Sequence, residues 1–308
     1  MIKKVLIVGS GGFIGTHLFS HFENLENFEA YGCDLHPKTA PLARYFSVNN
    51  PIPDYSSIFR SQNFDYCINA SGSGNVAYSF IQSLQDFNLN VSNVIALLDA
   101  IKQNAPKCKF LNFSSAAVYG NPERIPTDET SEIKSLSPYG VHKFISETIC
   151  KEYYNFFQIR TCSMRVFSAF GPGLKKQLFW DIYSKASQSK NNEVELWGTG
   201  DETRDFIFID DIVQAADLII QNDFFSGTSL NVANGIETTV RHAAACLLKN
   251  TYPGRILKFN GKQKEGDPQR WQADISILKS FGYSPRFGVE QGLVHYADWI
   301  KRFHNLNS

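Results

Sequence analysis

The sequence has little that would place it in a membrane, on nucleic acid or outside the cell. None of its apolar runs approaches the roughly 20 residues needed to cross a bilayer. Lys plus Arg equals Asp plus Glu, at 30 each among 308 residues, and the sequence pI is about 7.0. Because no charge of one sign is in excess, we expect no nucleic-acid partner and no membrane partner.

Cysteine pairs and an export signal are also missing. The six cysteines are scattered, mostly within apolar runs, which favours buried free thiols over disulfides or a metal site. At the start of the chain, Lys3 and Lys4 precede an apolar run that ends at Gly9, which is too short for a signal peptide. We therefore expect a cytoplasmic protein without a bound metal.

What the sequence does contain begins with a strand, a glycine turn and a helix. Residues 4–8 form a short, mostly apolar run, Gly9, Gly12 and Gly15 follow at three-residue intervals, and an amphipathic segment extends to about Asn24. Glycines let the backbone approach a pyrophosphate at a helix N-terminus, where free N–H groups favour an anion. The spacing departs from the commonest fingerprint, G-x-G-x-x-G, so a mere tight turn is the alternative interpretation.

An acidic residue favours the phosphate site. A second strand, residues 30–33, ends at Asp34, about 20 residues after Gly15, where dinucleotide-binding units use a carboxylate to bind the ribose hydroxyls. The same carboxylate would repel a 2′-phosphate, and Lys38 is the only nearby cation. The sequence therefore predicts NAD rather than NADP.

Strands and helices continue to alternate as far as residue 166. Strands are expected at residues 44–48, 65–70, 109–113 and 161–166, and helices at 86–104 and 138–157. This pattern predicts a doubly wound, mostly parallel α/β sheet. The segments from Ser71 to Gly74 and from Ser114 to Gly120 follow strand ends, where such sheets bind ligands, although serines there equally suit turn caps.

Tyr139 and Lys143 lie four residues apart, near the start of the helix expected at Pro138. Ser137 suits the cap and Pro138 suits the first helical position, which places both side chains on one face. A free phenol has a pKa of about 10, and a nearby ammonium favours the phenolate. Alone, the pair fits an exposed tyrosine and lysine as well as a catalytic pair.

After residue 167 the regular alternation breaks. Helices are expected within residues 174–200, after a cap at Asp210 and Asp211, from about residue 238 and at 289–302, with short strands at 193–197, 206–209, 230–233 and 256–259. No composition change marks a linker. We predict a Rossmann-type cofactor domain of residues 1–167, with returning segments at about 205–233, and a smaller C-terminal α/β substrate lobe of residues 168–204 and 234–308.

Together these motifs resemble those of the extended short-chain dehydrogenase/reductase proteins. Within them the chain is similar to the NAD-dependent nucleotide-sugar epimerase/dehydratase group, of the UDP-glucose 4-epimerase type. The resemblance covers nearly the whole chain, with six motifs in the family's order. They are Gly9-x-x-Gly12-x-x-Gly15, Asp34, Ser114-Ser115-x-x-Val118-Tyr119-Gly120, Tyr139-x-x-x-Lys143, Arg165-Val166-Phe167 with Gly171-Pro172-Gly173, and Arg204-Asp205-Phe206-Ile207 with Asp210-Asp211.

The resemblance implies a role for each matching residue. Tyr139 would be the acid and base on the sugar hydroxyl, Lys143 would lower its pKa and bond the nicotinamide ribose, and Ser115 would orient the sugar oxygen. The implied NAD contacts are Gly9, Gly12, Phe13, Ile14, Gly15, Asp34, Ala70, Ser71, Gly72, Ser114, Tyr139, Lys143 and Val166. The implied contacts to a nucleotide-diphosphate sugar are Ser73, Ser115, Ser168, Trp197, Arg204 and Lys264. A homodimer through residues 86–104 and 138–157 is a further implication.

Departures from the family narrow the activity. Ala116 and Ala117 stand where dehydratases carry an Asp-Glu pair for eliminating a hydroxyl, so 4,6-dehydratase activity is not expected. Ser168 replaces a common Asn, Lys264 a common Arg and Asn69 a common His, which leaves the substrate open. Arg204 would bind the diphosphate, or else form a structural ion pair with Asp201 or Asp205.

Three functions are compatible with these residues. The first is an NAD-dependent nucleotide-sugar epimerase that acts at C4 through a transient 4-keto sugar. The second is a 4-ketoreductase or 4-dehydrogenase with net redox change, and the NAD preference disfavours the reductase because biosynthetic reductases usually use NADPH. The third is a binding protein without catalysis, which the intact Ser115, Tyr139 and Lys143 disfavour. Polysaccharide synthesis is the setting that the family suggests.

Overall fold

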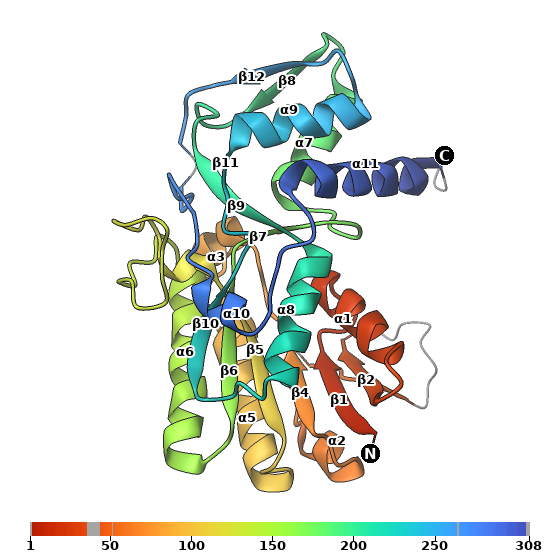
Figure 1. Cartoon of the computed structure of the whole chain (residues 1–308), viewed down its shortest axis with the longest axis vertical. Coiled ribbons are helices and arrows are strands. Elements are labelled where there is room, and N and C mark those ends of the chain that lie inside the picture. The colour runs from red at the N-terminus through yellow and green to blue at the C-terminus, as the bar shows by residue number, and fades with distance from the viewer. Residues whose placement is uncertain (1, 36–43, 51, 264, 306–308) are drawn as a thin grey trace.

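A seven-stranded parallel sheet organises the larger part of the molecule (Figure 1). The computed structural model describes residues 2–35, 44–50, 52–263 and 265–305. The strands run in the order β10-β6-β5-β4-β1-β2-β3. Their bounds are β1 (Lys3–Val8), β2 (Phe28–Asp34), β3 (Tyr45–Ser47), β4 (Tyr66–Asn69), β5 (Lys109–Ser115), β6 (Thr161–Val166) and β10 (Thr228–Val232). The doubly wound α/β sheet is confirmed, and its order reverses between β1 and β4, where such sheets bind ligands.

The residues of β1 divide the core between the two faces of the sheet. Val5 and Ile7 belong to the apolar cluster that includes helices α1 (Phe13–Glu23) and α8 (Ile209–Gln221), whereas Leu6 and Val8 belong to the other. That second cluster includes α2 (Ser56–Ser61), α5 (Asn93–Asn104) and α6 (Pro138–Phe157). A strand with helices on both faces must be apolar at successive positions, which explains the continuous apolar run.

The C-terminal part adds two small sheets and three long helices above the large sheet (Figure 1). One sheet joins β7 (Ser168–Phe170), β9 (Thr203–Phe208) and β11 (Glu237–Thr239), and the other joins β8 (Glu193–Leu196) and β12 (Ile256–Phe259). The helices are α7 (Gln177–Gln188), α9 (Val240–Thr251) and α11 (Val289–Asn305). One apolar cluster runs from Phe22 of α1 to Phe179 of α7 and Tyr296 of α11, so both parts share a core. Within the segment 205–233, β10 lies in the large sheet and β9 in a small one.

Two expected features differ in the structure. The helix expected at 86–104 is divided into α4 (Ser83–Phe87), a π-helical turn η2 (Asn88–Ser92) and α5. Within this turn the side chain of Asn90 donates to the carbonyl of Asp86, which competes with the helical ladder. Asp210 and Asp211 do not cap α8, which begins at Ile209. Asp211 instead accepts the backbone N–H groups of two residues of the C-terminal segment, Arg286 and Phe287.

The remaining elements are short. They are the helices α3 (Val76–Ile81) and α10 (Ser276–Ser280) and the 3₁₀ turn η3 (Ala116–Val118). All six cysteine thiols are free, and five of them are buried. Within the described residues, no helix is both long enough and apolar enough to cross a membrane.

Candidate active site

The glycine turn between β1 and α1 is packed too closely for side chains. Gly9 has a φ of +82°, and a Cβ on Gly15 would lie 2.0 Å from the Gly9 carbonyl oxygen. Asp34, at the end of β2, accepts the backbone N–H of Gly11 at 2.7 Å and that of Leu35 at 2.7 Å. The structure therefore brings Asp34 against the glycine turn, as a dinucleotide site requires. The sequence analysis did not single out Gly11, although a Cβ there would lie 2.7 Å from the Asp34 carboxylate.

The second loop, after β4, is held by a chain of amides. Asn69 accepts the hydroxyl of Ser71 at 2.5 Å and donates to Asn112 at 3.1 Å. Asn93 of α5 donates to the same Ser71 hydroxyl at 2.8 Å. The residue that replaces the family's common His therefore shapes this loop from inside the sheet. Because these contacts occupy the Ser71 side chain, the backbone of Ala70, Ser71 and Gly72 is the part left to face a cofactor.

Ser115 and Tyr139 meet where β5 ends and α6 begins. Ser137 caps α6, accepting the Gly140 N–H at 3.1 Å, and Pro138 occupies the first turn, as the sequence predicts. A Cβ on Gly140 would lie 2.5 Å from the carbonyl oxygen of Ala117, so this glycine lets the helix approach the turn after Ser115. The Ser115 hydroxyl is close enough to Tyr139 to influence the pKa of its phenol.

Burial controls the charge of Tyr139 and of Lys143. Burial raises the pKa of Tyr139 to about 12, although the Ser115 hydroxyl lowers it. Burial lowers the pKa of Lys143 to about 8, opposed by the charges of Asp86 and Glu147. The expected effect of Lys143 on the pKa of Tyr139 is not seen, and the Lys143 Nζ lies 6.0 Å from the Tyr139 ring centre and donates to the Phe113 carbonyl at 2.8 Å. Desolvation outweighs a charge at that separation.

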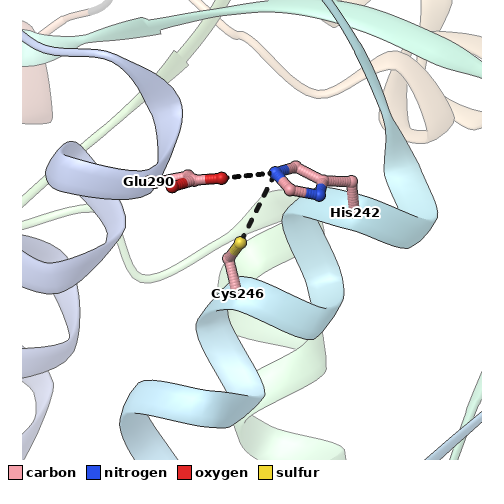
Figure 2. A group of neighbouring side chains, drawn as sticks. All are labelled: His242, Cys246 and Glu290. Atoms are coloured by element: carbon pink, nitrogen blue, oxygen red, sulfur yellow. Dashed lines mark hydrogen bonds and ion pairs between the residues drawn. The ribbon is translucent and has the colours of Figure 1, made fainter.

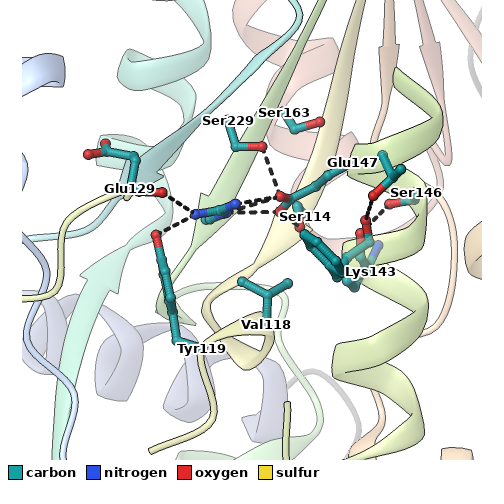
Figure 3. Close-up of polar contacts among 12 residues, drawn as sticks. Ser114, Val118, Tyr119, Glu129, Lys143, Ser146, Glu147, Ser163 and Ser229 are labelled. Carbon is teal, nitrogen blue, oxygen red and sulfur yellow. Dashed lines mark hydrogen bonds and ion pairs between the residues drawn. The ribbon is translucent and has the colours of Figure 1, made fainter. Parts of the chain in front are cut away.

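A buried ion-pair network joins α6 to β6 (Figure 3). Arg165 of β6 donates to both carboxylate oxygens of Glu147, with its Nη2 at 2.8 Å from Oε2. Ser114 and Ser229 donate to the same carboxylate. The guanidinium also binds the Tyr119 hydroxyl at 2.8 Å. The Ser114 hydroxyl is therefore engaged within the sheet, which leaves its backbone for the cofactor contact that the resemblance implies.

The predicted substrate residues are spread over the smaller sheets. Arg204 of β9 is largely buried, and its guanidinium lies 5.7 Å from the ring of Trp271 and 3.8 Å from Asp267. Burial lowers its pKa, and Asp267 opposes this shift. The suggested pairing with Asp201 or Asp205 is wrong, because Asp201 lies beside Arg241 and Asp205 accepts backbone N–H groups. Asp267 and Trp271 were not predicted as its partners.

The other predicted substrate residues lie on several different elements. Ser168 pairs with Phe206 in the same small sheet, and Ser73 accepts the N–H of Asn75 at 3.3 Å in the loop after β4. Trp197 follows β8 and is exposed over half of its surface. Lys264 lies outside the described residues. Trp271 donates to the Gly120 carbonyl at 2.9 Å, which ties the Arg204 region to the segment after Ser115.

A comparison of sequences gives the family. Residues 5–233 match the profile of the NAD dependent epimerase/dehydratase family. The chain belongs to this family. Membership confirms the family that the motifs predict and, with it, NAD as the cofactor. The glycine turn and Asp34 are the residues here that fit this cofactor.

Individual relatives of this epimerase/dehydratase chain extend over its whole length. A putative UDP-glucose 4-epimerase of Methanocaldococcus jannaschii is 26% identical, covering 96% of this chain and 98% of the relative. The solved UDP-glucuronic acid 4-epimerase of Bacillus cereus, in complex with UDP-glucuronic acid and NAD, is 25% identical with a TM-score of 0.86, covering 97% and 99%. A UDP-N-acetylglucosamine 4-epimerase of Methanobrevibacter ruminantium shares the fold, with 21% identity and a TM-score of 0.85 over 98% and 99%.

One further polar cluster lies on the epimerase/dehydratase chain between α9 and α11 (Figure 2). His242 contacts Glu290 at 2.9 Å and the Cys246 thiol at 3.6 Å. These are the only described residues whose donor atoms are grouped as metal ligands would be. The side chains of His242 and Glu290 are each at least half exposed and are hydrogen-bonded to one another. We therefore interpret the cluster as a contact between two helices.

Proposed function

We propose that this protein is a UDP-sugar 4-epimerase that keeps its NAD through each turnover. The observation that carries the proposal is the meeting of Ser115, Tyr139 and Lys143 at the carboxyl end of the sheet, beside a turn lined by Ala116 and Ala117. Methyl groups cannot exchange protons, so the site serves oxidation and reduction at a carbinol carbon but not elimination. The names of the relatives in the preceding section support uridine as the base and C4 as the reacting carbon.

The side chains divide the proton chemistry between them. When bound, NAD supplies the hydride acceptor and donor. Ser115 holds the C4 oxygen while Tyr139 removes its proton and later returns it, a contribution of roughly 10²–10⁴ to the rate. Lys143 keeps a positive charge beside the phenol and donates to the cofactor ribose. Because burial raises the pKa of Tyr139 to about 12, we propose that the positive charge of Lys143 is needed to form its phenolate.

Substrate and cofactor contacts follow the same geometry. We infer that the adenosine ribose binds Asp34 and the pyrophosphate binds the turn from Gly9 to Gly15. We infer that Arg204 binds the substrate diphosphate, since a guanidinium fork suits phosphate oxygens. Asp267 and Trp271 would hold the guanidinium in place. We propose that the chain divides into the cofactor domain and the substrate lobe predicted from the sequence. The sugar would then bind between the large sheet and the lobe that carries Arg204.

One assay separates an epimerase from the net 4-ketoreductase or 4-dehydrogenase. Purified protein is incubated with UDP-glucose, UDP-N-acetylglucosamine and UDP-glucuronic acid, with and without added NAD, while absorbance at 340 nm and sugar products are followed. The proposal predicts an isomerised sugar without net NADH. Stoichiometric formation or consumption of NADH would replace it with the oxidoreductase.

Exposed apolar side chains on α5 and α6 bear on how the protein assembles. Ile95 of α5 and Val141 and Phe144 of α6 stay exposed, and the last two lie three residues apart on one face. We propose that these helices form a homodimer, and light scattering after size exclusion should give twice the 34.7 kDa chain mass. The free buried thiols suit a reducing compartment, which supports a place in the cytoplasm.

A further inference from the structure

A buried carboxylate faces the catalytic pair from the neighbouring helix. Asp86, in the last turn of α4, is fully buried, and its Oδ2 lies 2.7 Å from Nδ1 of His142 on α6. His142 stands between Tyr139 and Lys143 in the sequence, and the ring of Phe87 packs edge-on against it. The contact therefore joins α4 to the segment of α6 that carries the catalytic residues.

The second oxygen of Asp86 is unusual. Oδ1 is buried without a hydrogen-bond partner among the described residues, and so is Oδ1 of Asn90 one turn further on. Unsatisfied buried acceptors are rare and call for a reason. Both atoms lie at the π-helical turn, a distortion that often marks a functional site. A carboxylate that is hydrogen-bonded through only one oxygen can still attract a neighbouring positive charge.

Lys143 is the neighbour that lacks a counter-charge. Its ammonium is buried and donates to one carbonyl, that of Phe113, although it carries three donors. No described carboxylate forms an ion pair with it. A buried charge without a partner is costly, so a nearby negative group is needed to keep Lys143 protonated.

The groups around Lys143 leave one candidate. Glu147, one turn along α6, is bound by Arg165 at both oxygens, so its charge is largely cancelled. Burial raises the pKa of Cys150 to about 12, which keeps that thiol neutral. The elements packed on this part of α6 contribute these titratable or charged side chains: Tyr139, His142, Glu147 and Cys150 of α6 itself, Tyr78 of α3, Asp86 of α4, and Arg165 and Cys162 of β6. Lys109 of β5 pairs with Asp223 instead, and Lys102 of α5 with Asp99.

We propose that Asp86, anchored by His142, is a positioning residue that supplies the counter-charge of the catalytic Lys143. The inference deepens the proposed function, on which it rests. Asp86 touches neither substrate nor cofactor in this role. It acts on Lys143 through space, while His142 binds one of its two oxygens and the other has no hydrogen-bond partner among the described residues. Among the charges near Lys143, Asp86 has the largest effect in raising its pKa.

The test measures the titration of Lys143 directly. Protein labelled with ¹³Cε-lysine is titrated by NMR between pH 6 and 11, and the Lys143 signal is assigned by its loss in Lys143→Arg. Asp86→Asn should lower the Lys143 midpoint by about one unit, since a neighbouring opposite charge shifts a pKa by roughly 1–3 units. In the active enzyme, the alkaline limb of kcat should move down by the same amount. The NMR midpoint is measured whether or not a sugar is epimerised, so it is independent of the proposed function.

Two further variants separate charge from structure. His142→Asn can still donate to Asp86, so its Lys143 midpoint should stay at the wild-type value. Asp211→Asn removes another buried carboxylate, one held by backbone N–H groups near residue 286, and should leave the midpoint unmoved. An unchanged midpoint in folded Asp86→Asn would overturn the proposal. So would a fall of one unit in His142→Asn or in Asp211→Asn.

Discussion

The Arg165–Glu147 pair should be among the strongest single determinants of stability in this protein. Both side chains are less than a tenth exposed, and Glu147 accepts from Arg165, Ser114 and Ser229. Glu147→Gln keeps the shape of the side chain but removes the charge, leaving the guanidinium buried without a counter-ion. Breaking a buried pair in this way costs about 3–5 kcal/mol in the free energy of unfolding.

Thermal unfolding followed by circular dichroism would measure this loss. At roughly 2–4 °C per kcal/mol in domains of 150–250 residues, Glu147→Gln should lower Tm by about 6–20 °C. Arg165→Gln should cost a similar amount. Since the two groups interact directly, the double variant should lose less than the sum of the single losses, by about 1–3 kcal/mol.

An exposed pair in the same molecule provides the matched control. Asp181 and Lys185 lie 2.7 Å apart on the surface of α7, four residues apart in the sequence. Asp181→Asn should change the unfolding free energy by less than about 0.5 kcal/mol. A loss below about 1 kcal/mol in Glu147→Gln, or single losses that simply add in the double variant, would refute the view that this pair fastens α6 to β6.

Three other variants test the site. Tyr139→Phe should lower kcat by roughly 10²–10⁴-fold without loss of bound NAD, because only the proton-transferring oxygen is removed, and turnover within tenfold of wild type would exclude Tyr139 as the acid and base. Lys143→Met should be inactive. It should nevertheless be more stable than the wild type at pH 7, by up to about 3 kcal/mol in the free energy of unfolding. The reason is that the Lys143 pKa of about 8 in the folded protein lies below the unfolded value of 10.5, so the buried charge destabilises the fold below pH 8. This advantage in unfolding free energy should fade from pH 8 to 10.5, and a constant difference would contradict the assignment. Asp34→Ser should weaken NAD binding more than NADP binding in direct titrations, and an equal loss for both would argue against the ribose contact.

Local signals in the sequence were sufficient for the elements that carry the catalytic residues. Ser137 and Pro138 define the start of α6 within the segment itself, so its bounds of 138–157 agree with the prediction. The partners of Arg204 could not be found in this way, because Asp267 and Trp271 are more than 60 residues away and only the folded lobe brings them together. The π-helical turn was missed for a different reason: its apolar spacing is helical on both sides, and the Asn90 side chain disturbs only the backbone bonds.

Two adjacent turns of α6 carry three buried charged or titratable groups, and each group is bound by a different element. His142 meets Asp86 of α4, Lys143 meets the Phe113 carbonyl of β5, and Glu147 meets Arg165 of β6. Apolar packing would tolerate small sliding of the helix, whereas these hydrogen bonds hold only over a few tenths of an ångström and fix its position along and across the sheet. The position of Tyr139 against Ser115 is therefore set by polar contacts behind it. It follows that variants in this buried layer should alter turnover even where no side chain that touches the sugar has changed.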